Sequence, residues 1–331
     1  MAKASERKYI EDIVAGDTVE QAFLVADRDL RTSRGGSFYI DLELMDRTGT
    51  VSAKIWDASR QLFESFSGDD FVVARARSET YRGKLQLVVT HVRRLDPEKV
   101  DLAEFLPTTS KDIPTLIARL WEMAGGIRNA YLQNLLVLFL DDEAFMAGFQ
   151  AVPGGVSIHH ACLGGLLEHT VAMAELGLVV GERYPNVDGD LLLAGTILHD
   201  VGKVASFECG RGFRYTDAGG LIGHLPLGAS MVEERAAQIE GFPQPLLELV
   251  LHLIFSHHGQ YEYGSPVLPA TAEAIALHYI DNLDAKLNAF ELALLGDQDE
   301  ETSWTRWNRI FDRRLFKGRV PSGGGEGDGE G

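Results

Sequence analysis

The chain has 331 residues, enough for about two domains of ordinary size. Its 45% hydrophobic and 24% charged residues can form a sizeable core in a soluble protein. No stretch approaches the roughly 18 to 20 apolar residues of a membrane span, and the first residues lack an apolar signal region, so we expect a cytoplasmic protein. Cys162 and Cys209 form no CxxC pair, so we expect reduced thiols rather than a structural zinc knuckle.

The net charge of −18 argues against a nucleic-acid partner until its distribution is considered. Residues 1–100 hold 16 basic and 17 acidic residues, so nearly all of the negative charge lies in the other 231 residues. Six basic residues lie between Arg75 and Arg94, where Glu79 is the single acidic residue. A polyanion responds to the charge within a Debye length, about 10 Å. The basic run is therefore either a nucleic-acid surface or a solvated strand face.

The first domain, residues 1–96, shows the alternation that is typical of β-strands. Strands are expected after residue 17 and at residues 38–46, 50–56, 71–80 and 84–95. A short helix is expected at residues 58–66, between the third and fourth strands. Three strands, a short helix and two strands in about 80 residues are the order of an OB-fold barrel. A linker with Pro97 and Pro107 follows at residues 97–111.

OB barrels bind single strands with a basic groove and aromatic stacking platforms. Lys54 and Trp56 share a strand face opposite Val51, Ala53 and Ile55. Each candidate aromatic residue, taken alone, is more often part of the core or the rim than a stacking platform. The co-occurrence of basic and aromatic residues nevertheless predicts a nucleic-acid surface made of Phe38, Tyr39, Lys54, Trp56, Tyr81, Arg82 and Lys84.

The second domain, residues 112–315, has a helical pattern almost throughout, which predicts an all-α fold. Helices are expected near residues 112–124, 128–140, 161–183, 190–201, 226–240, 245–256, 271–294 and 303–315. Residues 316–331 are rich in glycine and acidic residues and should be a disordered tail.

A scattered set of histidine and aspartate residues carries the chemistry of this domain. A lone histidine on an apolar helix face, such as His169, is more often structural. A buried aspartate, however, is costly unless it is paired or binds a metal. The joint pattern predicts a divalent-metal site of the kind that hydrolyses phosphate esters, with the ligands His169, His199, Asp200, His224, His257 and Asp281.

One further residue is expected to act on the phosphate. Gly202 lets the chain turn after the His-Asp doublet, so that Lys203 projects a cation beside the site. The alternative for Lys203 is an ordinary surface lysine. His258 follows the ligand His257 directly.

The segment Ile197-Leu-His-Asp-Val-Gly-Lys203, with the histidines around it, resembles the HD-domain superfamily of metal-dependent phosphohydrolases. The resemblance covers about residues 155–300. With a barrel ahead of that domain, the chain to about residue 315 resembles the YhaM family of 3′→5′ exoribonucleases, through segments 46–57, 158–169 and 221–225. The Gly-rich acidic tail is not expected of that family.

The family resemblance implies a two-metal site. One ion would take His169, His199, Asp200 and Asp281, and the second would take Asp200 as a bridge with His224 and His257. Asp200, Lys203 and His258 would be the catalytic residues, the last two orienting the scissile phosphate. The N/O ligand set suits Mn²⁺ best, with Fe²⁺, Co²⁺ or Ni²⁺ as alternatives, and Mg²⁺ less well.

The implied activity is exonucleolytic release of nucleoside monophosphates from single-stranded RNA, or also from single-stranded DNA, by phosphodiester hydrolysis. Two alternatives stay open: a nucleotide phosphohydrolase with a regulatory barrel, and a single-strand binder without activity. The residues leave open the formation of a homo-oligomer and the roles of His159 and His160. His252 and His278 are expected to be structural or to support the ligands.

Overall fold

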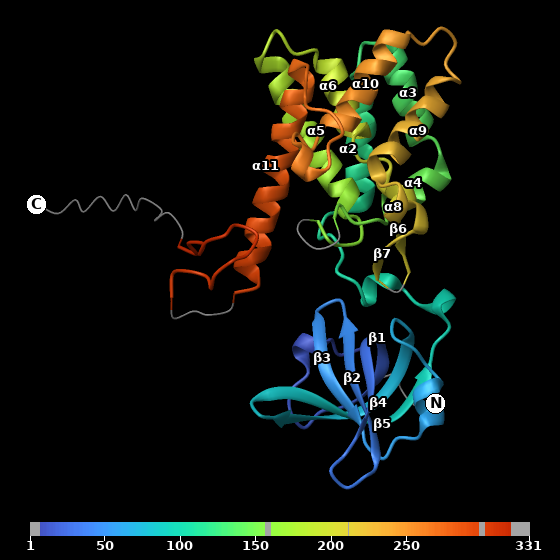
Figure 1. The fold of residues 1–331 in the computed structure, drawn as a ribbon, viewed down its shortest axis with the longest axis vertical. Coiled ribbons are helices and arrows are strands. Elements are labelled where there is room, and N and C mark those ends of the chain that lie inside the picture. The colour runs from blue at the N-terminus through green and yellow to red at the C-terminus, as the bar shows by residue number, and fades with distance from the viewer. Residues whose placement is uncertain (1–6, 156–159, 211, 298–301, 319–331) are drawn as a thin grey trace, which may run out of the picture.

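The computed structural model describes residues 7–155, 160–210, 212–297 and 302–318. A β-barrel and a bundle of helices lie end to end, with the connecting segment and a small hairpin between them (Figure 1). None of the helices in these ranges is long and apolar enough to cross a membrane.

The strands of the N-terminal part close into a barrel in the order β1-β2-β3-β5-β4. Neighbouring strands pair antiparallel except β3 and β5, which pair parallel. This order, with a short helix between β3 and β4, is that of an OB fold, so the predicted fold class is confirmed. The elements are β1 (Thr18–Thr32), β2 (Phe38–Asp46), β3 (Gly49–Ile55), α1 (Arg60–Glu64), β4 (Phe71–Tyr81) and β5 (Lys84–Arg94), preceded by the 3-10 helix η1 (Ile10–Asp12).

The connecting segment, expected as a linker at 97–111, is packed against the barrel. It contains the 3-10 helices η2 (Pro97–Lys99) and η3 (Leu102–Glu104). The side chains of Phe105 and Leu106 that follow are buried against Leu24 and Phe71. The rings of Phe71 and Phe105 meet edge to face, with centroids 4.9 Å apart.

The helical part is built around α6 (Gly189–Leu198), in which every residue from Leu191 to Leu198 is buried. Helices α3, α5, α10 and α11 pack on it from different sides. Since a helix that is apolar all round must be covered all round, α6 becomes the centre of the bundle. The other helices are α2 (Ile113–Gly125), α3 (Ala130–Leu140), α4 (Glu143–Phe149), α5 (Gly165–Arg183), α7 (Lys203–Ser206), α8 (Asp217–Leu221), α9 (His224–Ala236), α10 (Gln244–Ser256) and α11 (Ala272–Leu295).

A two-stranded hairpin interrupts the helices and reaches back to the barrel. It consists of β6 (Phe207–Cys209) and β7 (Phe213–Tyr215). Phe213 packs against the cluster formed by the connecting segment and the barrel. Arg214 forms an ion pair with Asp69, which precedes β4. The helical domain is therefore not purely α, and its small β element joins the two parts.

The helix predicted at 303–315 is wrong. Isolated β-bridges join Trp304 to Phe316 and Asn308 to Arg313, and Asp312 has a φ of 49°, which is incompatible with a right-handed helix. The apolar residues that suggested a helix are largely exposed, with Trp307 at 63%. A helix here would therefore gain little stability from packing its apolar face against the rest of the protein. Residues 316–318 belong to this bridged segment rather than to a tail, and the rest of the predicted tail lies outside the described residues.

We predict that Phe105→Ala lowers the free energy of unfolding by about 3 kcal/mol or more, because a fully buried phenylalanine loses its contacts and leaves a cavity. Urea unfolding followed by circular dichroism measures the effect. Phe316→Ala, at a ring that is 50% exposed, is the matched control and should change the stability by less than about 1 kcal/mol. Equal effects of the two substitutions would contradict a packed connecting segment.

Candidate metal centre

The His-Asp doublet lies where α6 ends, and α10 crosses α6 closely enough to bring a second histidine beside it. A Cβ on Gly195 would lie 2.3 Å from Leu253 Cδ1, so the absence of a side chain lets the two helices approach. His257 follows α10 directly, and its ring centroid lies 4.8 Å from that of His199. Two imidazoles that are 58 residues apart in the sequence therefore meet in the buried interior.

The imidazoles of His199 and His257 are each oriented by a hydrogen bond to the backbone carbonyl three residues earlier. Nδ1 of His199 lies 2.7 Å from the Thr196 carbonyl oxygen, and Nδ1 of His257 lies 2.8 Å from that of Ile254. A carbonyl oxygen can only accept a hydrogen bond, so each Nδ1 carries the proton and each Nε2 presents a lone pair. This is how histidine ligands are commonly held in place around a metal.

Asp200 lies between these histidines with one oxygen toward each side. Its Oδ2 is 3.2 Å from His199 Nε2, whereas its Oδ1 is 3.4 Å from His224 Nε2 and 3.7 Å from His257 Nε2. Burial acts to raise the pKa of this carboxyl, but Lys203 and His199 hold the pKa well below its ordinary value. The group is therefore an ionised carboxylate whose oxygens point into two neighbouring donor sets.

His169 on α5 faces α11. Its Nδ1 donates to Asp284 Oδ2 over 2.7 Å, and its Nε2 lies 3.3 Å from Asp281 Oδ1. Burial acts to lower the pKa of His169, but hydrogen bonds to Asp281 and Asp284 outweigh it and raise the pKa to about 9. The surroundings of Nε2 therefore favour a positive charge, which a metal ion would supply as well as a proton does.

The carboxylate of Asp284 is a residue that sequence reasoning missed. It accepts from His169 Nδ1 and also from His160 Nε2, over 2.9 Å. The sequence held one signal for it, since Asp284 follows Asp281 by one helical turn and must share its face of α11. The role left open for His160 is thus a structural contact to the carboxylate behind His169, and His159 lies outside the described residues.

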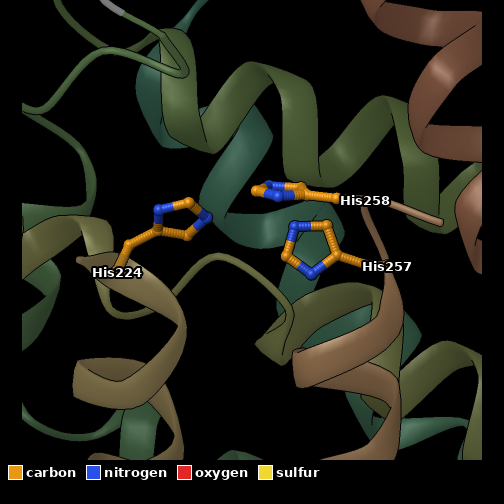
Figure 2. A group of neighbouring side chains, drawn as sticks. All are labelled: His224, His257 and His258. Atoms are coloured by element: carbon orange, nitrogen blue, oxygen red, sulfur yellow. The ribbon is translucent and has the colours of Figure 1, made fainter. Parts of the chain in front are cut away.

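A second group of imidazoles lies on the other side of Asp200. His224, His257 and His258 point toward one another, His224 from the start of α9 and the other two from the end of α10 (Figure 2). Burial lowers the pKa of His224 to about 4, and burial also holds the pKa values of His257 and His258 below the ordinary value. All three rings are neutral at pH 7 and can donate lone pairs to a cation. His258, expected only at the phosphate, belongs to this group by its position.

The donor atoms fit divalent metal ions. Within the part of the chain that the structure describes, His199 Nε2, His224 Nε2 and Asp200 Oδ1 are buried without a hydrogen-bond partner. Unsatisfied polar atoms in the interior are costly, and a cation between them would remove that cost. Close groups of donors include His169, His199 and Asp281, as well as His199, Asp200 and His257. Mixed imidazole and carboxylate ligands suit divalent transition metals such as Mn²⁺, Fe²⁺, Co²⁺ and Ni²⁺.

Lys203, expected to project a cation beside the site, lies there as a mostly buried partner of Asp200. Its side chain is 11% exposed, its Nζ lies 2.5 Å from Asp200 Oδ2, and it donates to the Gly154 carbonyl. Within the fold it is first a partner of the central carboxylate. It still lines the floor of a cavity over the site, together with Asp200 and His257.

Gly202 is needed for close approach rather than for a turn. Its backbone is right-handed helical (φ −65°, ψ −16°), a conformation open to any residue. A Cβ, however, would lie 2.0 Å from the His224 carbonyl oxygen and 2.4 Å from the Gly228 nitrogen. The glycine therefore lets the start of α9 touch the loop after α6, which places His224 beside Asp200.

Of the predicted barrel residues, three form one group. The rings of Tyr39 and Trp56 are 5.0 Å apart, and Lys54 Nζ lies 5.0 Å and 5.5 Å from their centroids. Trp56 is 49% exposed. This group forms a partly exposed aromatic platform, and its cation Lys54 is half-buried and also lies 3.9 Å from Asp41 Oδ1. Phe38 lies next to Tyr39 in the sequence, with its ring beneath the guanidinium of Arg60.

The other three predicted barrel residues lie at the tip of the β4–β5 hairpin, away from the platform. Tyr81 pairs with Lys84, and the Arg82 guanidinium lies 5.4 Å from the Tyr81 ring. Lys54 pairs in register with Val88, four residues further along β5 than Lys84. At about 3.3 Å per residue, the hairpin tip and the platform are on the order of 13 Å apart.

Comparison with known proteins places this geometry in a class. The HD domain model matches residues 166–286, which contain every proposed metal ligand. Two solved domains are similar to part of this chain: the second OB-fold domain of replication protein A from Methanococcus maripaludis (13% identity, 27% of this chain and 94% of that chain, TM-score 0.23) and an OB domain from Thermoplasma acidophilum (16%, 28% and 88%, TM-score 0.21). The fold and the site thus define a hydrolase in which an OB barrel precedes an HD domain.

Relatives over nearly the full length identify the family. A protein of Bacillus subtilis strain 168 named 3′-5′ exoribonuclease YhaM is 32% identical over 280 residues, covering 84% of this chain and 88% of that protein. A protein of the same name from Geobacillus sp. WCH70 is 32% identical over 313 residues, covering 93% and 96%. The chain belongs to the YhaM family of 3′-5′ exoribonucleases, as the sequence resemblance predicted.

We predict that Asp284→Ala weakens Mn²⁺ binding about 10- to 100-fold, because the carboxylate that orients His169 is lost while the proposed ligands remain. Isothermal titration calorimetry of the metal-free protein measures this affinity. Glu291→Gln, at an exposed position two turns further along α11, is the control and should bind Mn²⁺ like the wild type. An unchanged affinity of the Asp284 variant would contradict a supporting role for this residue.

Proposed function

We propose that this protein hydrolyses single-stranded RNA from its 3′ end and releases nucleoside monophosphates, using two divalent ions held around Asp200. The observation that carries the proposal is the position of the buried Asp200 carboxylate, which lies between two groups of histidine and aspartate side chains that can bind metal ions. Both groups belong to the HD domain of a YhaM family member. The named activity of the two relatives, 3′-5′ exoribonuclease, supports the substrate and the polarity.

The two proposed ions share the central carboxylate. One would be held by His169, His199, Asp200 and Asp281. The second would be held by Asp200, His224 and His257, with His258 next to it. When bound, divalent ions activate water near neutral pH and neutralise charge on the phosphate, and Mn²⁺ is our first expectation.

The chain's own groups prepare this site. Lys203 keeps Asp200 ionised, and it lies on the cavity floor where it can also face a phosphate oxygen. His258 is neutral and stands at the cavity edge, within reach of the phosphate. Asp200, Lys203 and His258 are thus our proposed catalytic residues, and the burial of Asp200 and His257 excludes bulk water from their contacts.

The barrel supplies a surface for the polymer. Tyr39, Lys54 and Trp56 form a platform on which bases can stack, and Tyr81, Arg82 and Lys84 add positive charge at the hairpin. Such contacts tolerate every base and both sugars, so we propose binding without base specificity and activity on single-stranded DNA as well. We propose the domain limits 1–96 for the barrel and 112–315 for the helical part, with the HD core at about 155–300.

The direct test is a time course on single-stranded RNA labelled at its 5′ end, with Mn²⁺ and with Mg²⁺. We expect a ladder of shortened labelled products with Mn²⁺, as degradation from the 3′ end requires. Asp200→Ala should abolish cleavage, because both proposed ions lose their shared ligand, and should still bind RNA in a filter assay.

The exonuclease proposal would be contradicted if the RNA stays intact under these conditions while the protein cleaves a mononucleotide or a nucleoside polyphosphate. Release of the labelled 5′ nucleotide as the first product would overturn the polarity.

The platform has its own prediction. Trp56→Ala should weaken the binding of a long single strand by about 10-fold, because one stacked base contributes roughly 1–3 kcal/mol. Fluorescence anisotropy of a labelled 20-nucleotide RNA measures it. Tyr184→Ala, at a helical-domain tyrosine that is 54% exposed, is the control and should leave the affinity unchanged. Equal affinity of the Trp56 variant and the wild type would remove the platform from the binding surface.

A further inference from the structure

A cavity of about 400 Å³ opens over the metal centre. Its floor contains Asp200, His257 and Asp281, and its wall is formed by Tyr263, Asn282 and Lys286. The volume is at the low end of the range for small-molecule sites, so the cavity suits one or two nucleotide units rather than a longer strand. The wall residues hold no metal donor in the arrangement above and are not explained by the hydrolytic chemistry.

The cation on this wall is unusual for its surroundings. Lys286 is the single basic residue of α11, which carries Glu273, Asp281, Asp284 and Glu291, and it lies in the part of the chain that holds nearly all of the net negative charge. Within the residues that the structure describes, Lys286 forms no ion pair, and its recorded neighbour is the Phe311 ring, 5.8 Å from Nζ. Lys203, the other lysine of the cavity, is already paired with Asp200.

The position of Lys286 along α11 relative to Asp281 indicates which phosphate it can bind. It follows the ligand Asp281 by five residues, which is about 7.5 Å along a helix axis. Lys286 is therefore offset along α11 by a distance comparable to the separation of neighbouring phosphates in an extended strand, and it lines the same cavity as Asp281. A lysine at this place can bind the phosphate next to the scissile one.

The wall also carries an aromatic residue. Tyr263, in the 3-10 helix η4 (Tyr261–Tyr263), lines the cavity together with His258 and is 64% exposed. An exposed ring at the edge of a cavity offers a face for a base, and stacking is tolerant of sequence. Because Tyr263 lines the same cavity as His258 and Asp200, a base stacked on its ring would lie near the proposed reacting phosphate.

We propose that Tyr263 and Lys286 form a subsite for the last two nucleotides of the strand, and that this subsite rests on the proposed exonuclease function. Tyr263 stacks on the terminal base, and Lys286 binds the phosphate one step upstream of the scissile bond. Because the subsite binds a second phosphate, a trinucleotide is a better substrate than a dinucleotide.

The test compares a dinucleotide with a trinucleotide, both without a 5′ phosphate, because only the trinucleotide has the upstream phosphate. Lys286→Gln should lower kcat/KM for the trinucleotide about tenfold, the effect of one charge-assisted contact, and leave the dinucleotide within about twofold. Lys286→Arg should restore most of the loss. Tyr263→Ala should lower kcat/KM about tenfold on both substrates, and Tyr263→Phe should not, because the ring is kept.

Lys99→Gln, at a lysine side chain that is 80% exposed on the connecting segment, is the matched control and should behave like the wild type. A second readout is the affinity of the Asp200→Ala protein for a 5′-fluorescein trinucleotide, which Lys286→Gln should weaken about tenfold without any turnover.

Two outcomes overturn the subsite, and they differ. If the wild type degrades RNA and Lys286→Gln lowers kcat/KM equally for both substrates or for neither, the subsite is wrong while the exonuclease function stands. If the wild type leaves both oligonucleotides intact, the proposed function itself fails and the subsite fails with it.

Discussion

The arrangement of the helices around the site depends on one buried carboxylate, that of Asp200. Asp200 is 2% exposed, and an ionised group at that depth is tolerated only when positive or polar groups surround it. Lys203 supplies one charge, and three imidazoles supply donors that a metal ion would join. The close crossing at Gly195 and the contact at Gly202 bring those partners to Asp200. The geometry of the site therefore depends on how α6, α9 and α10 pack.

The charge of the molecule supports a division of labour between its two parts. The barrel is nearly neutral overall and presents cations beside exposed rings, whereas the helical part carries almost the whole negative charge. A polyanion is repelled by most of that second surface. Within that part, the cavity over the proposed metal centre is lined by the two cations Lys203 and Lys286.

Sequence reasoning worked best where a residue's role is local or is part of a specific motif. The alternation in β2 and β3 gave the barrel, and the doublet His199-Asp200 gave the centre of the site. It failed where tertiary contacts decide the outcome. Apolar spacing alone predicted a helix at 303–315, although most of those apolar side chains are exposed. Nothing in the chain's order showed that His160 would meet Asp284, 124 residues away.

The sequence by itself determined the two-part organisation, the family and the residue types of the proposed metal site, because period, turn residues and motif spacing are properties of short segments. Only the tertiary structure decided which donors face each other and what stands behind them. Asp284 supports His169, Lys203 is buried against Asp200, and Lys286 lies free on the cavity wall among the described residues. These facts depend on distances between helices, and such distances are set by packing, which no local pattern encodes.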